Sequence, residues 1–390
     1  MDKETLSNYG WIVICVLVLA VLLALATPFG IFVSDAVKTT TQGLFDVNQT
    51  ALNSTNLVKM ESQSFPNDNS TSANETTYYT AEEIEADEHL YAIGKTKPEY
   101  VVAKFNDDYS EVVITKNGDD SDGQIMQYAP WGTQSPMVQH KNTLETAIIK
   151  EGITQMNGIG GSSAFVGCTK LLSVTLPTTL TYLGHHAFYK CSSLKVAPVI
   201  PINITDMPSS FAECTSLTNA PSIPNGVNDM SGTFHFCTSL TIAPSIPDSV
   251  TNMDTTFTGC SSLVSAPIIP NSINSMCATF QSCTTLKTVP TISNNTTDMS
   301  WAFDNCMSLT TIPAIPSSVI NMYHTFSNCT SLTGTIEINA NPTDYNDCFL
   351  GVDFEAQKIT LTGTSSILDE IGKTGTNYCT TCNGYCKGSH

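Results

Sequence analysis

Arginine is absent from this chain, and basic residues are few. The 390 residues include 16 lysines against 35 aspartates and glutamates, which gives a formal net charge of −19. Proteins that bind nucleic acid usually present a basic face, often with arginines that grip the phosphates. Because the chain has neither, we expect no nucleic-acid partner.

Patterns that support catalysis are also lacking. The seven histidines form no HExxH pair, and none has a spacing that pairs it with a nucleophile. We therefore expect that the protein is not an enzyme and that it carries no cofactor.

Only one long apolar run occurs, at residues 11–33, where 23 residues carry no charge. A membrane-spanning helix needs about 20 such residues, so we predict a retained membrane helix over residues 1–38. A cleaved signal peptide is the alternative, with a cleavage site at Ala24-Leu25-Ala26. A short leader ending in Gly10 also resembles the start of type IV-like pilins, although Cys15 stands where those proteins carry a glutamate.

Two further segments precede the main body of the chain. Residues 39–80 are rich in Asn, Ser and Thr, which predicts a disordered spacer. In residues 81–141, two runs rich in β-branched residues, 100–105 and 111–115, flank a turn at 106–109. This pattern predicts a β-hairpin, and we expect the hairpin to cap the end of the repeats.

The dominant feature is a repeat of 23 residues. Phenylalanine, cysteine and leucine recur together, three residues apart, from Phe165-Cys168-Leu171 to Phe326-Cys329-Leu332. A period of this length with one apolar set in phase predicts a leucine-rich α/β solenoid of about eight coils over residues 142–340. Its predicted core includes these three columns, for example Phe188, Cys191, Leu194, Phe211, Cys214, Leu217, Phe234, Cys237 and Leu240.

Each coil also suggests its own secondary structure. Met, Phe and Cys at i, i+4 and i+7 would share one face of a short helix. The residue before Met favours a helix N-cap in six successive coils: Asp206, Asp229, Asn252, Ser275, Asp298 and Asn321. A proline interrupts the apolar stretch that follows, so we expect a parallel ladder of very short strands, best formed at its N-terminal end.

The cysteines allow two interpretations. The eight in-register cysteines could be buried thiols or a disulfide ladder, and in-register side chains favour thiols because their Cβ atoms stay too far apart. In the predicted C-terminal cap, residues 341–390, Cys379, Cys382, Cys386 and His390 have a spacing that could hold zinc. Disulfides there are the favoured alternative.

Two sequence motifs connect the repeat with a known family. The run Ala187-Phe188-x-x-Cys191-x-x-Leu194 and the form Asp229-Met230-Ser231-x-x-Phe-x-x-Cys-x-Ser-Leu240 resemble BspA-type leucine-rich repeats. The resemblance implies a bacterial surface or secreted protein, often adhesive, with no catalytic residues.

These features together predict a membrane-tethered bacterial cell-surface protein. It would be anchored in the cytoplasmic membrane with its repeats outside, or secreted if the N-terminal segment is cleaved. A solenoid face would adhere to host or other cells through protein or glycan ligands. The alternative function is a pilin-like or passive structural component of the surface.

Overall fold

The computed structural model describes residues 78–94, 100–118, 125–126, 138–156, 164–289, 291–380 and 383. The predicted membrane helix, and the predicted spacer up to residue 77, lie outside these residues. Within the described ranges, no helix combines the length and the apolar content that crossing a membrane requires.

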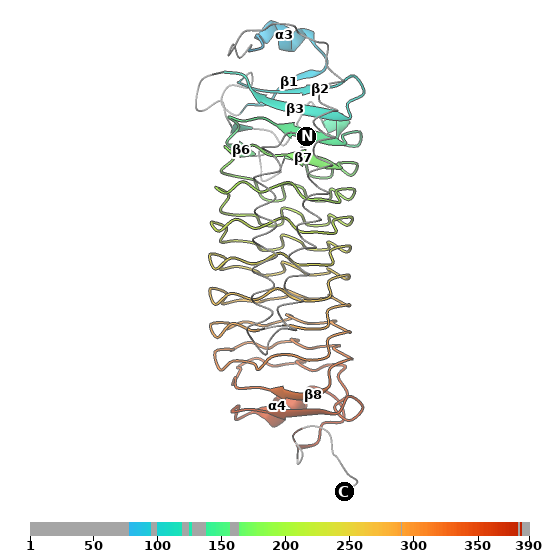
Figure 1. Cartoon of the computed structure of the whole chain (residues 1–390). Coiled ribbons are helices and arrows are strands. Elements are labelled where there is room, and N and C mark those ends of the chain that lie inside the picture. The colour runs from blue at the N-terminus through green and yellow to red at the C-terminus, as the bar shows by residue number, and fades with distance from the viewer. Residues whose placement is uncertain are drawn as a thin grey trace, which may run out of the picture. The chain divides into compact units, whose positions relative to one another are not determined.

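The regular elements are short and lie mainly at the two ends of the repeats (Figure 1). In chain order they are α3 (Ala81–Ala86), β1 (Leu90–Ala92), β2 (Val101–Phe105), β3 (Glu111–Lys116), β4 (Ile125–Met126), the 3-10 helix η3 (Val138–His140), β5 (Thr146–Ile149), β6 (Gln155–Met156), β7 (Ser173–Thr175), β8 (Gly334–Glu337), β9 (Ile359–Thr362) and α4 (Leu368–Gly372).

A five-stranded sheet joins the N-terminal module to the first coils, in the order β1-β2-β3-β5-β7. β2 and β3 form the predicted antiparallel hairpin, with Ala103 opposite Ile114. β3 then pairs in parallel with β5, and β5 with β7. Because the hairpin continues the sheet of the solenoid, its backbone groups cover the edge that the first coil would otherwise expose.

In the middle coils, the sheet shrinks to single bridges. Val196 pairs with Asn219 and Asn219 with Ile242, each 23 residues apart. The proline that follows two residues later has no N–H to extend the ladder, as predicted. Full strands return in β8 and β9, which pair in parallel where the sequence lacks that proline. The ladder is therefore well formed at both ends, whereas we had expected this only at the N-terminal end.

The predicted helix in each coil was wrong. The segment from Met to Cys consists of consecutive tight turns, as in Met253 to Cys260, where the amides of Thr256, Thr258 and Cys260 each bond to a carbonyl three residues back. Five of the six expected N-cap residues do cap, as where Oδ1 of Asp229 accepts a hydrogen bond from the amide of Ser231 at 2.8 Å. Asp206 does not, because Pro208 has no N–H to donate. However, the capped segment is a turn, and the Asp229 backbone bridges to neighbouring coils.

Hydrogen bonds between coils explain why turns replace the helix. A helix would direct each amide to its own chain, four residues back. Here the amide of every Phe in the column donates to the next coil, as from Phe234 to the carbonyl of Thr256 at 2.9 Å. From Phe188 to Phe349, the residues two before and two after each Phe have positive φ, as in Thr255 (57°) and Gly259 (73°). Left-handed residues at these places break any helix and aim alternate amides at the neighbouring coil.

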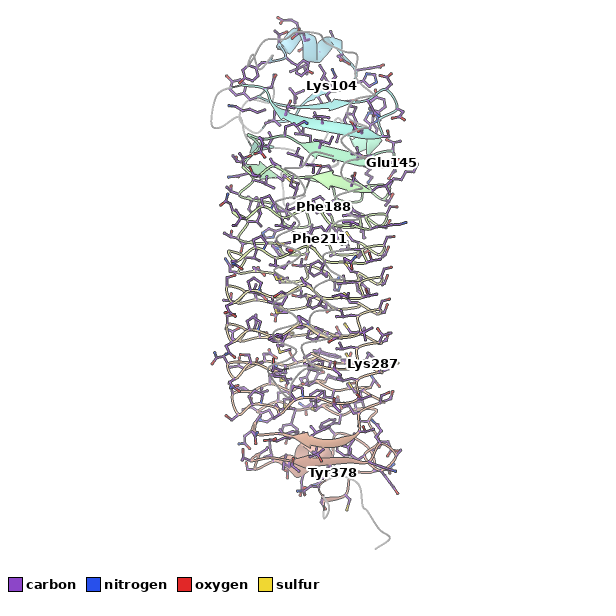
Figure 2. All side chains as sticks on the ribbon, in the orientation of Figure 1. Lys104, Glu145, Phe188, Phe211, Lys287 and Tyr378 are labelled. Atoms are coloured by element: carbon purple, nitrogen blue, oxygen red, sulfur yellow. The ribbon has the colours of Figure 1, made fainter. Side chains whose placement is uncertain are left out.

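The three predicted columns fill the core. Figure 2 labels two neighbours in the Phe column, Phe188 and Phe211. All nine core residues named from the sequence are fully buried. Rings of successive Phe residues stack at 5.1–5.9 Å, including Phe188 on Phe211 at 5.1 Å. The stack does not stop at residue 340, because Phe349 packs on Phe326 at 5.5 Å. A ninth coil therefore continues into the segment assigned to the C-terminal cap.

Candidate binding faces of the solenoid

Each coil has two parts with different chemistry. We call "turn face" the surface formed by eight segments of consecutive turns: residues 183–190, 206–213, 229–236, 252–259, 275–282, 298–305, 321–328 and 344–351. We call "proline face" the surface formed by the seven segments between them, from 191–205 to 329–343. Since the coils repeat in register, residues at equivalent places form columns on each face.

Between residues 183 and 351, the aromatic side chains outside the core all belong to the turn face. The proline face contains no Phe, Tyr, Trp or His. The turn face carries nine partly or fully exposed ones: His185, His186, Tyr189, His235, Phe236, Trp301, Tyr323, His324 and Tyr345. Tyr and Trp are enriched at protein interfaces because they combine a large apolar area with a polar group. The turn face is therefore the better candidate for binding.

The first aromatic group on this face surrounds Glu213. The Tyr189 hydroxyl donates to Oε1 of Glu213 at 2.6 Å, and Nζ of Lys190 lies 3.8 Å from Oε2. In the next coil, His235 and Phe236 meet edge to face at 4.5 Å, and Phe236 is 44% exposed. Burial lowers the pKa of His235, and the Glu213 carboxylate partly offsets this shift.

The second group lies three coils further along. The Trp301 and His324 rings stack at 4.0 Å, only 2° from parallel. Tyr323 meets the edge of both, at 5.3 Å from Trp301 and 4.4 Å from His324. Nε2 of His324 is 3.4 Å from Oδ2 of Asp347, whose side chain is half exposed. This group thus combines aromatic surface with an accessible carboxylate.

Charge also differs between the two faces. The segments of the turn face have eight carboxylates, of which Asp304 is buried, and a single lysine, Lys190. The proline face has two of each, Asp248 and Glu337 with Lys195 and Lys287. The net negative charge of the coils is therefore concentrated on the face that carries the aromatic residues.

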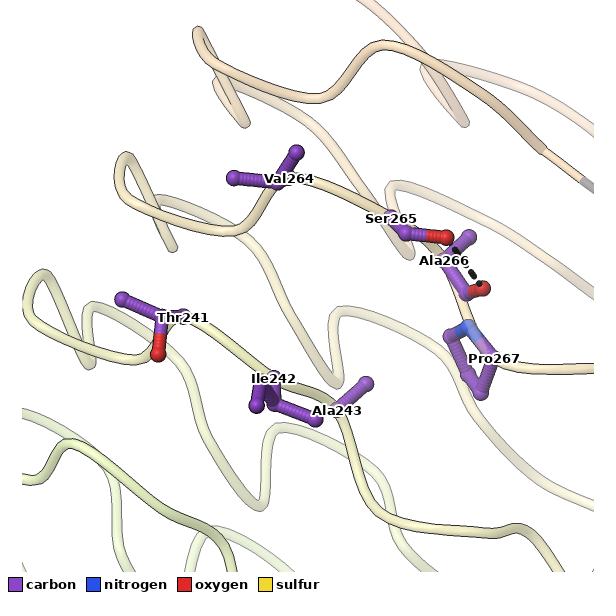
Figure 3. A pocket seen from close by; sticks show the side chains of 7 residues that line it. All are labelled: Thr241, Ile242, Ala243, Val264, Ser265, Ala266 and Pro267. Carbon is purple, nitrogen blue, oxygen red and sulfur yellow. Dashed lines mark hydrogen bonds between the residues drawn. The ribbon is translucent and has the colours of Figure 1, made fainter. Parts of the chain in front are cut away.

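Two shallow hollows lie on the proline face. One of about 280 Å³ lies between two adjacent coils (Figure 3), lined by Thr241, Ile242, Ala243, Val264, Ser265, Ala266 and Pro267. Ile242 is 67% exposed there. A second hollow, of about 350 Å³, lies beside Pro221 and Pro244. Neither is lined by a charged or aromatic side chain, so the two hollows could contribute apolar contacts, a few hydroxyls and the amide of Asn225.

The column of eight cysteines is made of buried thiols. The sulfur of each of the seven from Cys191 to Cys329 donates to the carbonyl of a Phe in the preceding coil at 3.1 Å, as from Cys214 to Phe188. Burial raises the pKa of Cys214 to about 12, so the reactive thiolate is suppressed. The sequence showed where these residues lie but not that their S–H groups act as donors.

The predicted C-terminal metal site is described only in part. Cys379 is half buried, whereas Cys382, Cys386 and His390 lie outside the described residues. In the part of the chain that the structure describes, no group of three or more His, Cys, Asp or Glu side chains could hold a metal ion. Zinc or disulfides at this end remain a prediction.

Comparison with known families agrees with the coil geometry. The profile of the "BspA type Leucine rich repeat region (6 copies)" matches residues 139–264 and 254–382, which together make up more than half of the chain. The chain therefore belongs to the BspA-type leucine-rich repeat family. No curated protein matches it.

Several solved bacterial structures are similar at low identity. A leucine-rich repeat protein from Bacteroides ovatus is 16% identical, covering 70% of this chain and 79% of that one, with a TM-score of 0.37. The leucine-rich repeat protein of T. pallidum is 21% identical over 55% of this chain and 90% of its own, with a TM-score of 0.33. A leucine-rich cell surface protein from Faecalibacterium prausnitzii is 18% identical, covering 74% and 97%, with a TM-score of 0.34.

Proposed function

We propose that this protein is a bacterial cell-surface adhesion protein, tethered to the cytoplasmic membrane, that binds a partner on host or other cells through the turn face. The observation that carries the proposal is that, between residues 183 and 351, exposed aromatic residues occur only on this face. Solenoids of this kind provide an extended surface for binding and no enclosed pocket for chemistry. Family membership supports a binding or structural role.

The repeat itself provides an internal comparison for each surface residue. Two residues after the column Phe, other coils carry small or polar residues: Gly167, Lys190, Glu213, Gly259, Ser282, Asn305, Asn328 and Gly351. Only Phe236 departs from this pattern, and it is 44% exposed. The fold does not need an aromatic ring at that place, because eight coils have none there. A contact with a partner explains the departure.

Binding can be tested with a variant that makes Phe236 resemble its equivalents. Phe236→Asn copies Asn305 and Asn328, and asparagine tolerates the left-handed backbone found there. We expect the full chain carrying Phe236→Asn to bind its ligand on a host-protein and glycan array at least about tenfold more weakly, as for a typical interface hot spot.

The matched control is Val196→Asn on the proline face. Val196 is 63% exposed, and Asn219 occupies the same place in the next coil. We expect this variant to bind like the unmodified chain. Equal losses in the two variants, or no loss in Phe236→Asn, would contradict binding through the turn face.

Surface location is a separate part of the proposal. The apolar run at residues 11–33 supports a membrane tether, and the polar segment that follows it would hold the repeats away from the bilayer. Protease added to intact cells should remove the repeats and leave cytoplasmic proteins whole. Repeats that are protected until the cells are lysed would contradict the surface location.

A further inference from the structure

The charge of the turn face indicates what kind of partner it accepts. Seven solvent-accessible carboxylates stand against one lysine on this face, whereas the proline face is balanced. Lys190 is already paired, because its Nζ lies 3.8 Å from Glu213. A partner that approaches the aromatic residues therefore meets an excess of negative charge. Such a field attracts cations and repels acidic chains.

The aromatic groups and the carboxylates are close enough to act on the same side chain of a partner. Glu213 contacts Tyr189 and lies one coil before His235 and Phe236. Asp347 contacts His324, which stacks on Trp301. A guanidinium or ammonium group gains from a carboxylate and from an aromatic ring at once, since the ring attracts cations to its face. Neutral sugars would leave the carboxylates without a counter-charge.

We propose that the partner of the turn face is a cationic polypeptide segment, rich in lysine or arginine, that lies extended along the columns. This inference rests on the function proposed above and adds the chemical class of the partner. Paired strands are about 4.8 Å apart, so the six coil steps from Glu213 to Asp347 span about 29 Å. An extended peptide rises about 3.3 Å per residue, so about nine residues reach from one carboxylate to the other.

The probe is therefore a fluorescent peptide of nine arginines, titrated with the full chain and followed by fluorescence anisotropy. We expect binding that weakens at least about fivefold when salt rises from about 50 to about 300 mM, because salt screens surface charges. Peptides of nine glutamates or nine serines should not bind. Failure of the arginine peptide to bind would overturn the inference.

Two double variants distinguish a local site from a general effect of net charge. Glu213→Asn with Asp347→Asn removes two charges from the turn face. Asp248→Asn with Glu337→Gln removes two from the proline face. We expect the first pair to weaken binding of the arginine peptide at least about fivefold and the second to leave it unchanged. Equal weakening by both pairs would overturn the inference.

The two proposals can fail separately. Suppose that the array identifies a neutral glycan whose binding depends on Phe236, and that the arginine peptide does not bind. This result would overturn the proposal of a cationic partner but would keep the turn face as a binding surface. A ligand that is a basic protein, displaced by the arginine peptide, would support both proposals.

Discussion

Replacing Phe257 by alanine would remove one ring from the middle of the aromatic stack. Phe257 is fully buried between Phe234 at 5.7 Å and Phe280 at 5.5 Å. Truncating a buried Phe to Ala costs about 3–5 kcal/mol, depending on how far the surroundings collapse into the cavity. Here the Phe257 amide is held by the carbonyl of Thr279 at 2.9 Å, which keeps the coils at their spacing. We therefore expect a loss of about 4 kcal/mol.

Two comparison variants separate the loss of the ring from other effects. Phe257→Leu keeps most of the volume and should cost less than about 1.5 kcal/mol. Ile242→Ala also truncates an apolar side chain, but Ile242 is 67% exposed. The loss of stability in this variant should therefore stay within about 0.5 kcal/mol.

Native-state hydrogen exchange is the suitable assay, because solenoids need not unfold in a single step. It reports the opening free energy of each coil from its own amides. In Phe257→Ala, exchange in peptides that cover Phe234 to Phe280 should speed up by about three orders of magnitude, which corresponds to about 4 kcal/mol. A cost below about 1 kcal/mol, or equal costs for alanine and leucine, would refute the stacked-column reasoning.

Three other predictions follow from buried groups and from backbone conformation. Alkylation at about pH 8, followed by mass spectrometry, should modify the half-buried Cys277 before any thiol of the core column, because burial keeps the column thiols protonated. Equal rates of alkylation at Cys277 and in the column would contradict this prediction. Burial, and then the charge of His89, lower the pKa of His140 below 6.5, so the folded state favours the neutral ring. The contribution of His140 to stability is therefore complete above about pH 6.5 and declines as the pH falls through and below that value. The urea midpoint should therefore be lower at pH 5.5 than at pH 7.5, and His140→Gln should reduce the difference; an unchanged midpoint would disprove this. Gly259→Ala should cost about 1–3 kcal/mol, since φ is +73° and the new Cβ would meet the Phe236 ring. Adding Phe236→Asn to Gly259→Ala should restore part of the lost stability, as measured by urea unfolding. If the losses of the two single variants simply add in the double variant, the Phe236 ring is not involved.

The core could be predicted from the sequence because burial follows the repeat directly. Phe, Cys and Leu recur at one phase, and every coil must bury the same positions for its neighbours to cover it. The ninth coil was missed even though Phe349 keeps the 23-residue interval. Its Cys and Leu places are taken by Val352 and Glu355, so the composite motif no longer matches.

The helix was predicted wrongly because its apolar spacing also fits a run of turns. Met, Phe and Cys at i, i+4 and i+7 can all point inward in either conformation. One sequence signal did favour turns. Two residues after Phe, several coils carry Gly or Asn, the residues that most readily adopt positive φ: Gly259, Asn305, Asn328 and Gly351.

The amino-acid sequence alone determined the period, the three inward columns and the shortage of basic residues, because each of these depends on residue type at a fixed spacing. Only the tertiary structure decided that amides cross to the next coil, that thiols donate to Phe carbonyls, and that Glu213, Phe236, Trp301 and Asp347 share one face. These features depend on contacts between residues 22 or more positions apart. They arise only when the coils stack, so no single repeat contains them.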